Sequence, residues 1–193
     1  MSRGLKLTDV LITIVIAIVF GVVYKLWGPL YSFVAPLGLH IDQLVYGMWF
    51  IAATVAFLII RKPGVALLAE IAASSGELLL GSQYGVEVLL YGVLQGLGAE
   101  LVFLLFLYKR FDMGVVILAA IGSTVGSLLM DWYKGYLGDL ALWNLSLFIG
   151  ARTVGAILLA GIFAYVLVKA LEKTGVTNLV RTADQSDYDA LNQ

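Results

Sequence analysis

Six runs of mostly apolar residues, separated by short polar or turn-rich breaks, dominate this sequence. A hydrocarbon core about 30 Å thick is crossed by about 20 such residues, and inside lipid a helix satisfies its own backbone polar groups. The chain is therefore predicted to be an all-α integral membrane protein, a six-transmembrane-helix bundle. The runs span residues 8–27, 41–60, 64–81, 84–108, 113–130 and 145–169, of which 64–81 is the shortest.

The composition agrees with a membrane protein and excludes several other classes. Apolar residues make up 61% of the chain and charged residues 13%, whereas soluble domains have about 45–50% and about 25%. The net charge of -1 offers no basic surface to nucleic acid. Cysteine is absent and His40 is the single histidine, so no thiolate or multi-histidine metal site is expected. No cofactor is predicted, and without a GxxxxGK[ST] phosphate loop the chain cannot itself drive ATP-dependent transport.

The distribution of lysine and arginine predicts the orientation in the membrane, because cytoplasmic loops hold the excess of these residues. With the N-terminus inside, nine of them are cytoplasmic and only Lys25 and Lys134 lie outside. Both termini are then cytoplasmic, with residues 1–172 forming a single membrane domain and residues 173–193 a polar cytoplasmic tail. The nine are Arg3, Lys6, Arg61, Lys62, Lys109, Arg110, Lys169, Lys173 and Arg181.

Charged residues inside the predicted spans are candidates for function, since each costs about 2.5–3.5 kcal/mol to insert. Two polar stripes contain most of the acids. Residues three or four apart share a helix face, and the short turn between the third and fourth segments makes those helices neighbours. The stripes are predicted to meet in a polar cleft that opens to the outside. They are Glu70, Ser74, Glu77 and Gly81 on the third segment, and Tyr84, Glu87, Tyr91 and Gln95 on the fourth.

Aromatic residues near the same depth complete a candidate site for a flat organic cation, which gains from carboxylates and from ring faces together. Glu77 is the leading counter-charge and Glu87 the second, while the deeper Glu70 and Glu100 are expected to serve helix packing. Arg152, the basic residue well inside a helix, is expected to pair with a glutamate, and residues 131–144 are interpreted as a loop. The predicted ligand-binding residues are Glu77, Glu87, Tyr84, Tyr91, Gln95, Trp132, Asn144, Trp49 and Tyr46.

Small residues spaced four apart allow two helices to approach closely. Most such pairs serve packing within a bundle. Ala17 and Gly21 lie in an otherwise uniformly apolar first segment, which suggests a face that docks another membrane protein.

Three stretches of the sequence resemble the YkoE family. They are Arg61-Lys-Pro-Gly-Val-Ala-Leu-Leu-Ala-Glu70, Gly81-Ser-Gln-Tyr-Gly85 and Gln95-Gly-Leu-Gly-Ala-Glu-Leu-Val-Phe103. The resemblance implies a bacterial plasma-membrane S component, the non-enzymatic substrate-binding subunit of an energy-coupling factor importer for thiamine or its hydroxymethylpyrimidine precursor. It also implies docking through Ala17 and Gly21 onto a transmembrane coupling subunit that carries ATPase subunits.

Two other classes of function remain open at this stage. One is a membrane-embedded enzyme that acts on a lipid or isoprenoid, although its carboxylates would usually be clustered on the cytoplasmic side. The other is a self-contained cation-coupled carrier that uses Glu70 and Glu100 as a relay. The absence of a detectable internal repeat disfavours a carrier built from two matching halves.

Overall fold

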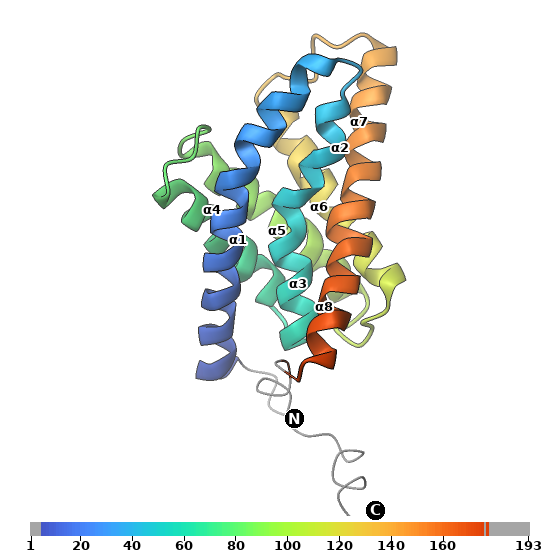
Figure 1. The fold of residues 1–193 in the computed structure, drawn as a ribbon. Coiled ribbons are helices and arrows are strands. Elements are labelled where there is room, and N and C mark those ends of the chain that lie inside the picture. Colours follow the sequence, from blue (N-terminus) through green and yellow to red (C-terminus); the bar gives the residue numbers. More distant parts are fainter. Residues whose placement is uncertain (1–4, 176, 178–193) are drawn as a thin grey trace, which may run out of the picture.

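In the computed structural model, which describes residues 5–175 and 177, the regular elements are all helical (Figure 1). The first span is α1 (Leu7–Val34) with the 3-10 turn η1 (Ala35–Leu37). The second consists of α2 (Ile41–Tyr46), the 3-10 turn η2 (Gly47–Phe50) and α3 (Ile51–Ile60). Three single helices follow, α4 (Val65–Leu79), α5 (Glu87–Leu105) and α6 (Met113–Tyr133). The last span is α7 (Leu142–Ala156), the π-helical η3 (Ile157–Phe163) and α8 (Ala164–Lys173).

The six helical spans agree in number with the six predicted from hydropathy. Within the described residues, five are long and apolar enough to cross a membrane. The exception is α4, which has 15 residues and corresponds to the shortest predicted segment. Of the predicted tail at 173–193, all but Lys173, Thr174, Gly175 and Thr177 lies outside the described residues.

The first helix continues beyond the predicted break at Gly28-Pro29. Pro29 lies inside α1, which runs to Val34. A proline removes only its own N–H, whose partner would be the carbonyl four residues earlier, so a long helix can continue past it. The prediction that the first span ends at residue 27 is therefore wrong.

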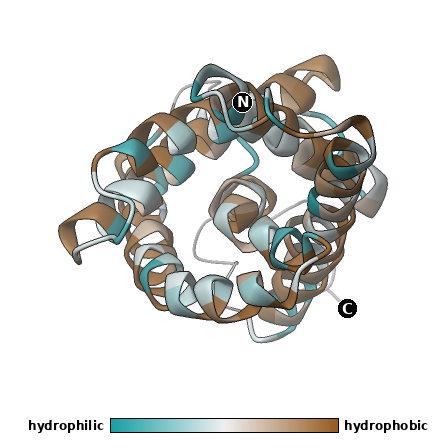
Figure 2. Ribbon diagram, turned by 90° about the horizontal axis from the view of Figure 1, so that it is seen from above, coloured by the Kyte–Doolittle hydropathy of each residue, from teal (hydrophilic) through white to brown (hydrophobic). Residues whose placement is uncertain are grey.

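The helices form a ring when viewed along the bundle (Figure 2). Around the ring α1 packs on α4, α4 on α5, α5 on α6 and α6 on the last span, and α2 contacts both α7 and α1. Helix α3 contacts most of these elements and all ten of its residues are buried. It therefore fills the half of the ring that lies nearest the start of α1 and the end of α8, while α2 packs against α7 near the other end (Figure 1).

The pair Ala17 and Gly21 lies in the contact between α1 and α4. Ala17 is 3% exposed, and a Cβ atom added to Gly21 would lie 3.0 Å from the Cα atom of Gly76 on α4. The small residues thus allow the two backbones to approach within the chain. This placement corrects the expectation of an exposed docking face at Ala17 and Gly21, because α4 already covers both residues.

We expect Gly21→Leu to lower the stability of the isolated protein by about 1–3 kcal/mol, through overpacking of the α1–α4 contact. Thermal unfolding in detergent is the measurement. Val22→Leu, at a neighbouring position that is 42% exposed, is the matched control and should melt like the wild type. An unchanged melting temperature in Gly21→Leu, with loss of partner co-purification, would instead favour a docking role.

Two acidic side chains stabilise the end of the bundle that holds the start of α1. The carboxylate of Glu100 on α5 accepts hydrogen bonds from the amides of Gly64, Ala66 and Leu67, at 2.6, 3.1 and 3.3 Å. These are free N–H groups at the start of α4, where a negative charge is favourable. At the same end Asp9 on α1 forms an ion pair with Lys62. Glu100 therefore has the packing role expected for it.

Candidate functional site

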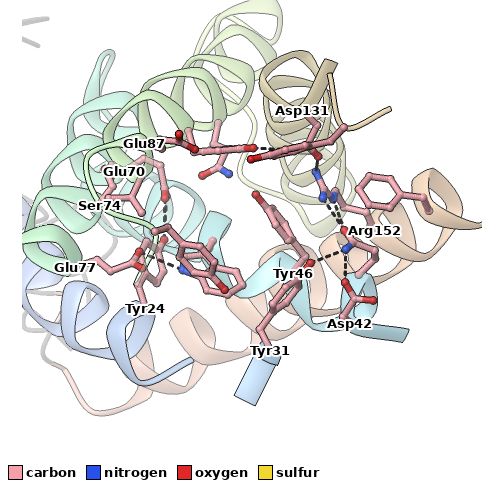
Figure 3. A pocket seen from close by; sticks show the side chains of 18 of the residues that line it. Tyr24, Tyr31, Asp42, Tyr46, Glu70, Ser74, Glu77, Glu87, Asp131 and Arg152 are labelled. Carbon is pink, nitrogen blue, oxygen red and sulfur yellow. Dashed lines mark hydrogen bonds and ion pairs between the residues drawn. The ribbon is translucent and has the colours of Figure 1, made fainter. Parts of the chain in front are cut away.

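A cavity of about 410 Å³ occupies the half of the bundle that contains the end of α1 and the whole of α2 (Figure 3). None of its lining residues comes from α3, since α3 fills the opposite half. Every span contributes to the wall, the second one through α2 and η2, and so do the loops at this end. Its lining residues are Tyr24, Tyr31, His40, Asp42, Gln43, Tyr46, Trp49, Glu70, Ser74, Glu77, Tyr84, Glu87, Val88, Tyr91, Gln95, Asp131, Tyr136, Phe148 and Arg152.

One side of the cavity carries two buried carboxyl groups of α4, Glu70 and Glu77 (Figure 3). Glu77 accepts hydrogen bonds from the indole N–H of Trp49 at 3.2 Å and from the hydroxyl of Ser82 at 2.8 Å. In the part of the chain that the structure describes, neither carboxyl group forms an ion pair. Buried carboxylates without a cationic partner are costly, so this side of the cavity favours a positively charged group.

Glu70 has a second role at the break in the second span. Its carboxyl group accepts hydrogen bonds from the hydroxyl of Tyr24 at 3.0 Å and from the amide of Ala53 at 3.1 Å. The Tyr24 hydroxyl also accepts a hydrogen bond from the amide of Ala52 at 3.1 Å. Both amides belong to the first turn of α3, where a helix leaves N–H groups without intrahelical partners. Glu70 and Tyr24 thus stabilise the broken span as well as lining the cavity.

Aromatic rings form a continuous wall beside these carboxyl groups. The ring of Trp49 lies 5.4 Å from those of Tyr31 and Tyr46 and 6.0 Å from that of Tyr84, centroid to centroid. The contacts with Tyr31 and Tyr84 are edge-to-face, an arrangement that aromatic pairs favour. Such a wall offers ring faces to a flat or cationic ligand.

The other side of the cavity is built around Arg152 of α7, which is 2% exposed. Its guanidinium forms an ion pair with Asp131 and donates to the side-chain oxygen of Gln43 at 2.8 and 2.6 Å. It also lies over the rings of Tyr46 and Phe148, at 3.8 and 4.5 Å from their centroids. The arginine is therefore compensated by groups from α2 and α6 and by a ring of its own helix, α7 (Figure 3).

The pairing of Arg152 differs from the sequence-based expectation of a glutamate partner. Asp131 was expected in a loop over 131–144, but α6 continues to Tyr133 and α7 begins at Leu142. Asp131 consequently lies inside the bundle, at 3% exposure, and accepts a second hydrogen bond of 2.6 Å from the hydroxyl of Tyr91. Burial of Asp131 against the arginine explains why the helix extends past a charged residue.

Glu87 and Gln95, both on α5, differ in how far the protein satisfies them. Glu87 forms an ion pair with Lys134, which follows the end of α6. The side chain of Gln95 is buried and lines the cavity, yet it has no hydrogen-bond partner among the described residues. Buried polar side chains nearly always have a partner. Gln95 is therefore available to a bound molecule, whereas Glu87 is already neutralised.

Seven of the nine predicted ligand-binding residues line the cavity, namely Tyr46, Trp49, Glu77, Tyr84, Glu87, Tyr91 and Gln95. Trp132 and Asn144 are not among the lining residues and are exposed on the surface. Sequence reasoning did not select Tyr24, Tyr31, Asp42, Gln43, Asp131, Phe148 or Arg152 as ligand-site residues. The available signal was a polar side chain inside or beside an apolar run, which applies to Tyr24, Gln43 and Arg152.

Among the described residues, no group of three or more histidine, cysteine, aspartate or glutamate side chains is close enough together to hold a metal ion.

Comparison with known proteins finds three similarities. The family described as the permease component of an ABC-type cobalt transport system matches residues 8–126. The chain is 37% identical over 177 residues to YkoE of Bacillus subtilis (strain 168), described as an HMP/thiamine permease protein, covering 91% of this chain and 89% of that one. A solved structure titled as an S-component of an ECF transporter superposes with a TM-score of 0.87, at 37% identity and with the same two coverages.

Proposed function

Because the chain belongs to the S components of energy-coupling factor (ECF) transporters, we propose that it captures thiamine or the hydroxymethylpyrimidine precursor of thiamine for import. As an S component it is a multi-pass plasma-membrane protein and not an enzyme. It acts together with membrane coupling and ATPase partners. The choice of ligand follows the name of the B. subtilis relative and the chemistry of the cavity.

The observation that carries the proposal is the pair of buried carboxyl groups, Glu70 and Glu77, which line an aromatic cavity without an ion-pair partner in the described chain. Thiamine carries a thiazolium cation, which suits a carboxylate and the neighbouring ring faces. Its aminopyrimidine ring has both donors and acceptors. The unpartnered amide of Gln95 can pair with either kind of group.

Titration calorimetry of the purified protein in detergent tests this proposal. We expect saturable binding of thiamine in the absence of ATP and of any partner subunit. Hydroxymethylpyrimidine lacks the thiazolium ring, so its affinity relative to thiamine measures how much the contacts of that cationic ring contribute. Uptake should require the coupling and ATPase subunits. Absence of binding to both compounds would contradict the proposal, and uptake by the chain alone would favour a self-contained carrier.

We also propose that the cavity faces outward and that both termini are cytoplasmic. The start of α1 and the end of α8 lie at the end of the bundle opposite the cavity (Figure 1). Lysine and arginine are concentrated at that end, which the positive-inside rule assigns to the cytoplasm. An outward cavity is also what capture before import requires.

Single cysteines test the orientation, since the natural sequence contains none. Lys109→Cys, in the exposed loop after α5, should react with an impermeant maleimide only after the membrane is opened. Asp139→Cys, in the exposed loop between α6 and α7, should react in intact cells. The unmodified chain is the control for background labelling, and the reverse labelling pattern would overturn the orientation.

A further inference from the structure

We infer that the cavity binds the free alcohol form of its ligand and rejects the corresponding phosphate ester, because Asp131 neutralises the arginine that lines it. This inference rests on the proposed function and specifies the class of ligand within it. It is carried by the charges around the cavity and by the contacts of Arg152.

Acidic groups outnumber basic ones around the cavity. Among the described lining residues there are five carboxyl groups and one arginine, in addition to His40. The carboxyl groups come from four separate elements, α2, α4, α5 and α6. They are Asp42, Glu70, Glu77, Glu87 and Asp131.

The guanidinium of Arg152 has little capacity left for an anion. Its Nε and Nη2 atoms donate to Gln43, and its Nη1 atom donates to Ser127 at 3.1 Å and to Asp131. The rings of Tyr46 and Phe148 cover it at 3.8 and 4.5 Å. Asp131 compensates the positive charge at direct contact. An arginine in this state holds the wall together and does not present a free cation to a phosphate.

Two lysines at this end of the bundle already have partners as well. Lys134 forms an ion pair with Glu87. The ammonium group of Lys25 donates to the carbonyl oxygen of Gly81, beyond the end of α4. Neither lysine lines the cavity.

A phosphate monoester would bring about -1.5 to -2 charges into this surrounding. Like charges brought together in a partly buried site oppose binding strongly, and a site that leaves the phosphate oxygens without donors opposes it further. The hydroxyl group of the free alcohol has no charge to compensate. We expect thiamine monophosphate to bind at least about 100-fold more weakly than thiamine.

The experiment compares thiamine with thiamine monophosphate, and hydroxymethylpyrimidine with its phosphate, by calorimetric titration of the wild-type protein at pH 8. The ratio of the two affinities is the readout. Asp131→Asn keeps the shape of the side chain and a hydrogen-bond acceptor for Tyr91, but it leaves the positive charge of Arg152 without its carboxylate partner. We expect this variant to reduce the preference for the alcohol over the phosphate ester by about tenfold or more. Asp139→Asn removes the same charge from an exposed position outside the cavity and is the matched control.

Tyr136→Arg provides a second test that does not disturb a buried ion pair. Tyr136 lines the cavity from the loop after α6 and is 57% exposed. An added, unpaired cation there should reduce the preference for the alcohol over the phosphate ester by about threefold or more. This variant decides the issue if Asp131→Asn does not give a cooperative melt.

The outcomes separate the two proposals. No binding of thiamine or of hydroxymethylpyrimidine contradicts the proposed function. If the wild-type protein binds the alcohols, and binds each phosphate with an affinity within about threefold of that for the matching alcohol, the inference is overturned while the proposed function stands. A ratio that stays the same in folded Asp131→Asn, or in Tyr136→Arg where the former does not fold, likewise overturns it.

Discussion

Glu77→Gln is expected to weaken thiamine binding by one to three orders of magnitude. Glu77 is 2% exposed and has neutral partners, the indole of Trp49 and the hydroxyl of Ser82. Removing the charged member of a buried, hydrogen-bonded ion pair costs about 2–5 kcal/mol, and each 1.4 kcal/mol is about tenfold in affinity. Glutamine keeps the size of the side chain and one oxygen acceptor, so the change tests the charge itself.

Glu87→Gln is the matched comparison for this measurement. Glu87 also lines the cavity, but Lys134 already forms an ion pair with it. We expect its effect on thiamine affinity to remain within about fivefold, because such partly exposed pairs contribute at most about 1 kcal/mol. Calorimetric titration of both purified variants provides the test. Unchanged affinity in both would contradict the counter-charge role of the cavity, and a larger loss in Glu87→Gln would exchange the two roles.

The second large effect concerns stability. Arg152→Met should destabilise the folded protein by about 3–5 kcal/mol, since it leaves the carboxylate of Asp131 buried without its cation. Thermal unfolding in detergent, followed by circular dichroism, measures the loss. The double variant Asp131→Leu with Arg152→Met replaces the pair by apolar groups and should recover at least half of it. A double variant no more stable than Arg152→Met would show that the arginine acts mainly through Gln43 and the two rings.

An exposed ion pair supplies the control for this stability measurement. Arg110 and Asp112 form an ion pair of 3.0 Å in the loop before α6, with side chains 61% and 48% exposed. Exposed pairs contribute about 0–1 kcal/mol. Arg110→Met should therefore change the melting temperature little, and a loss as large as that of Arg152→Met would mean that burial is not the cause.

The two polar stripes show how far helical periodicity alone predicts this site. Glu70, Ser74 and Glu77 on α4 line the cavity, as do Glu87, Tyr91 and Gln95 on α5. Side chains three and four apart share a face, and a short turn makes the two helices neighbours. Both relations are local in the sequence, so they were predictable before the fold was known.

The partner of Arg152 was not predictable in the same way. Its contacts Gln43, Ser127 and Asp131 come from α2 and α6, between 21 and 109 residues away along the chain. Which of many carboxyl groups meets one arginine depends on which helices are adjacent in space. Periodicity within each helix does not contain that information. The end of α6 was misplaced for the same reason. Asp131 is the charged residue at which the hydrophobic run stops, but its buried ion pair with Arg152 lets the helix continue to Tyr133.

The sequence by itself determined the membrane class, the number of spans and the acidic, aromatic character of the site, because lipid imposes the length and composition of each segment separately. Only the tertiary structure decided what each polar or small residue does. It placed Ala17 and Gly21 against α4, Glu100 at the start of α4, and Trp132 and Asn144 outside the cavity. These roles depend on long-range packing, in which a side chain's surroundings are set by helices distant in the sequence.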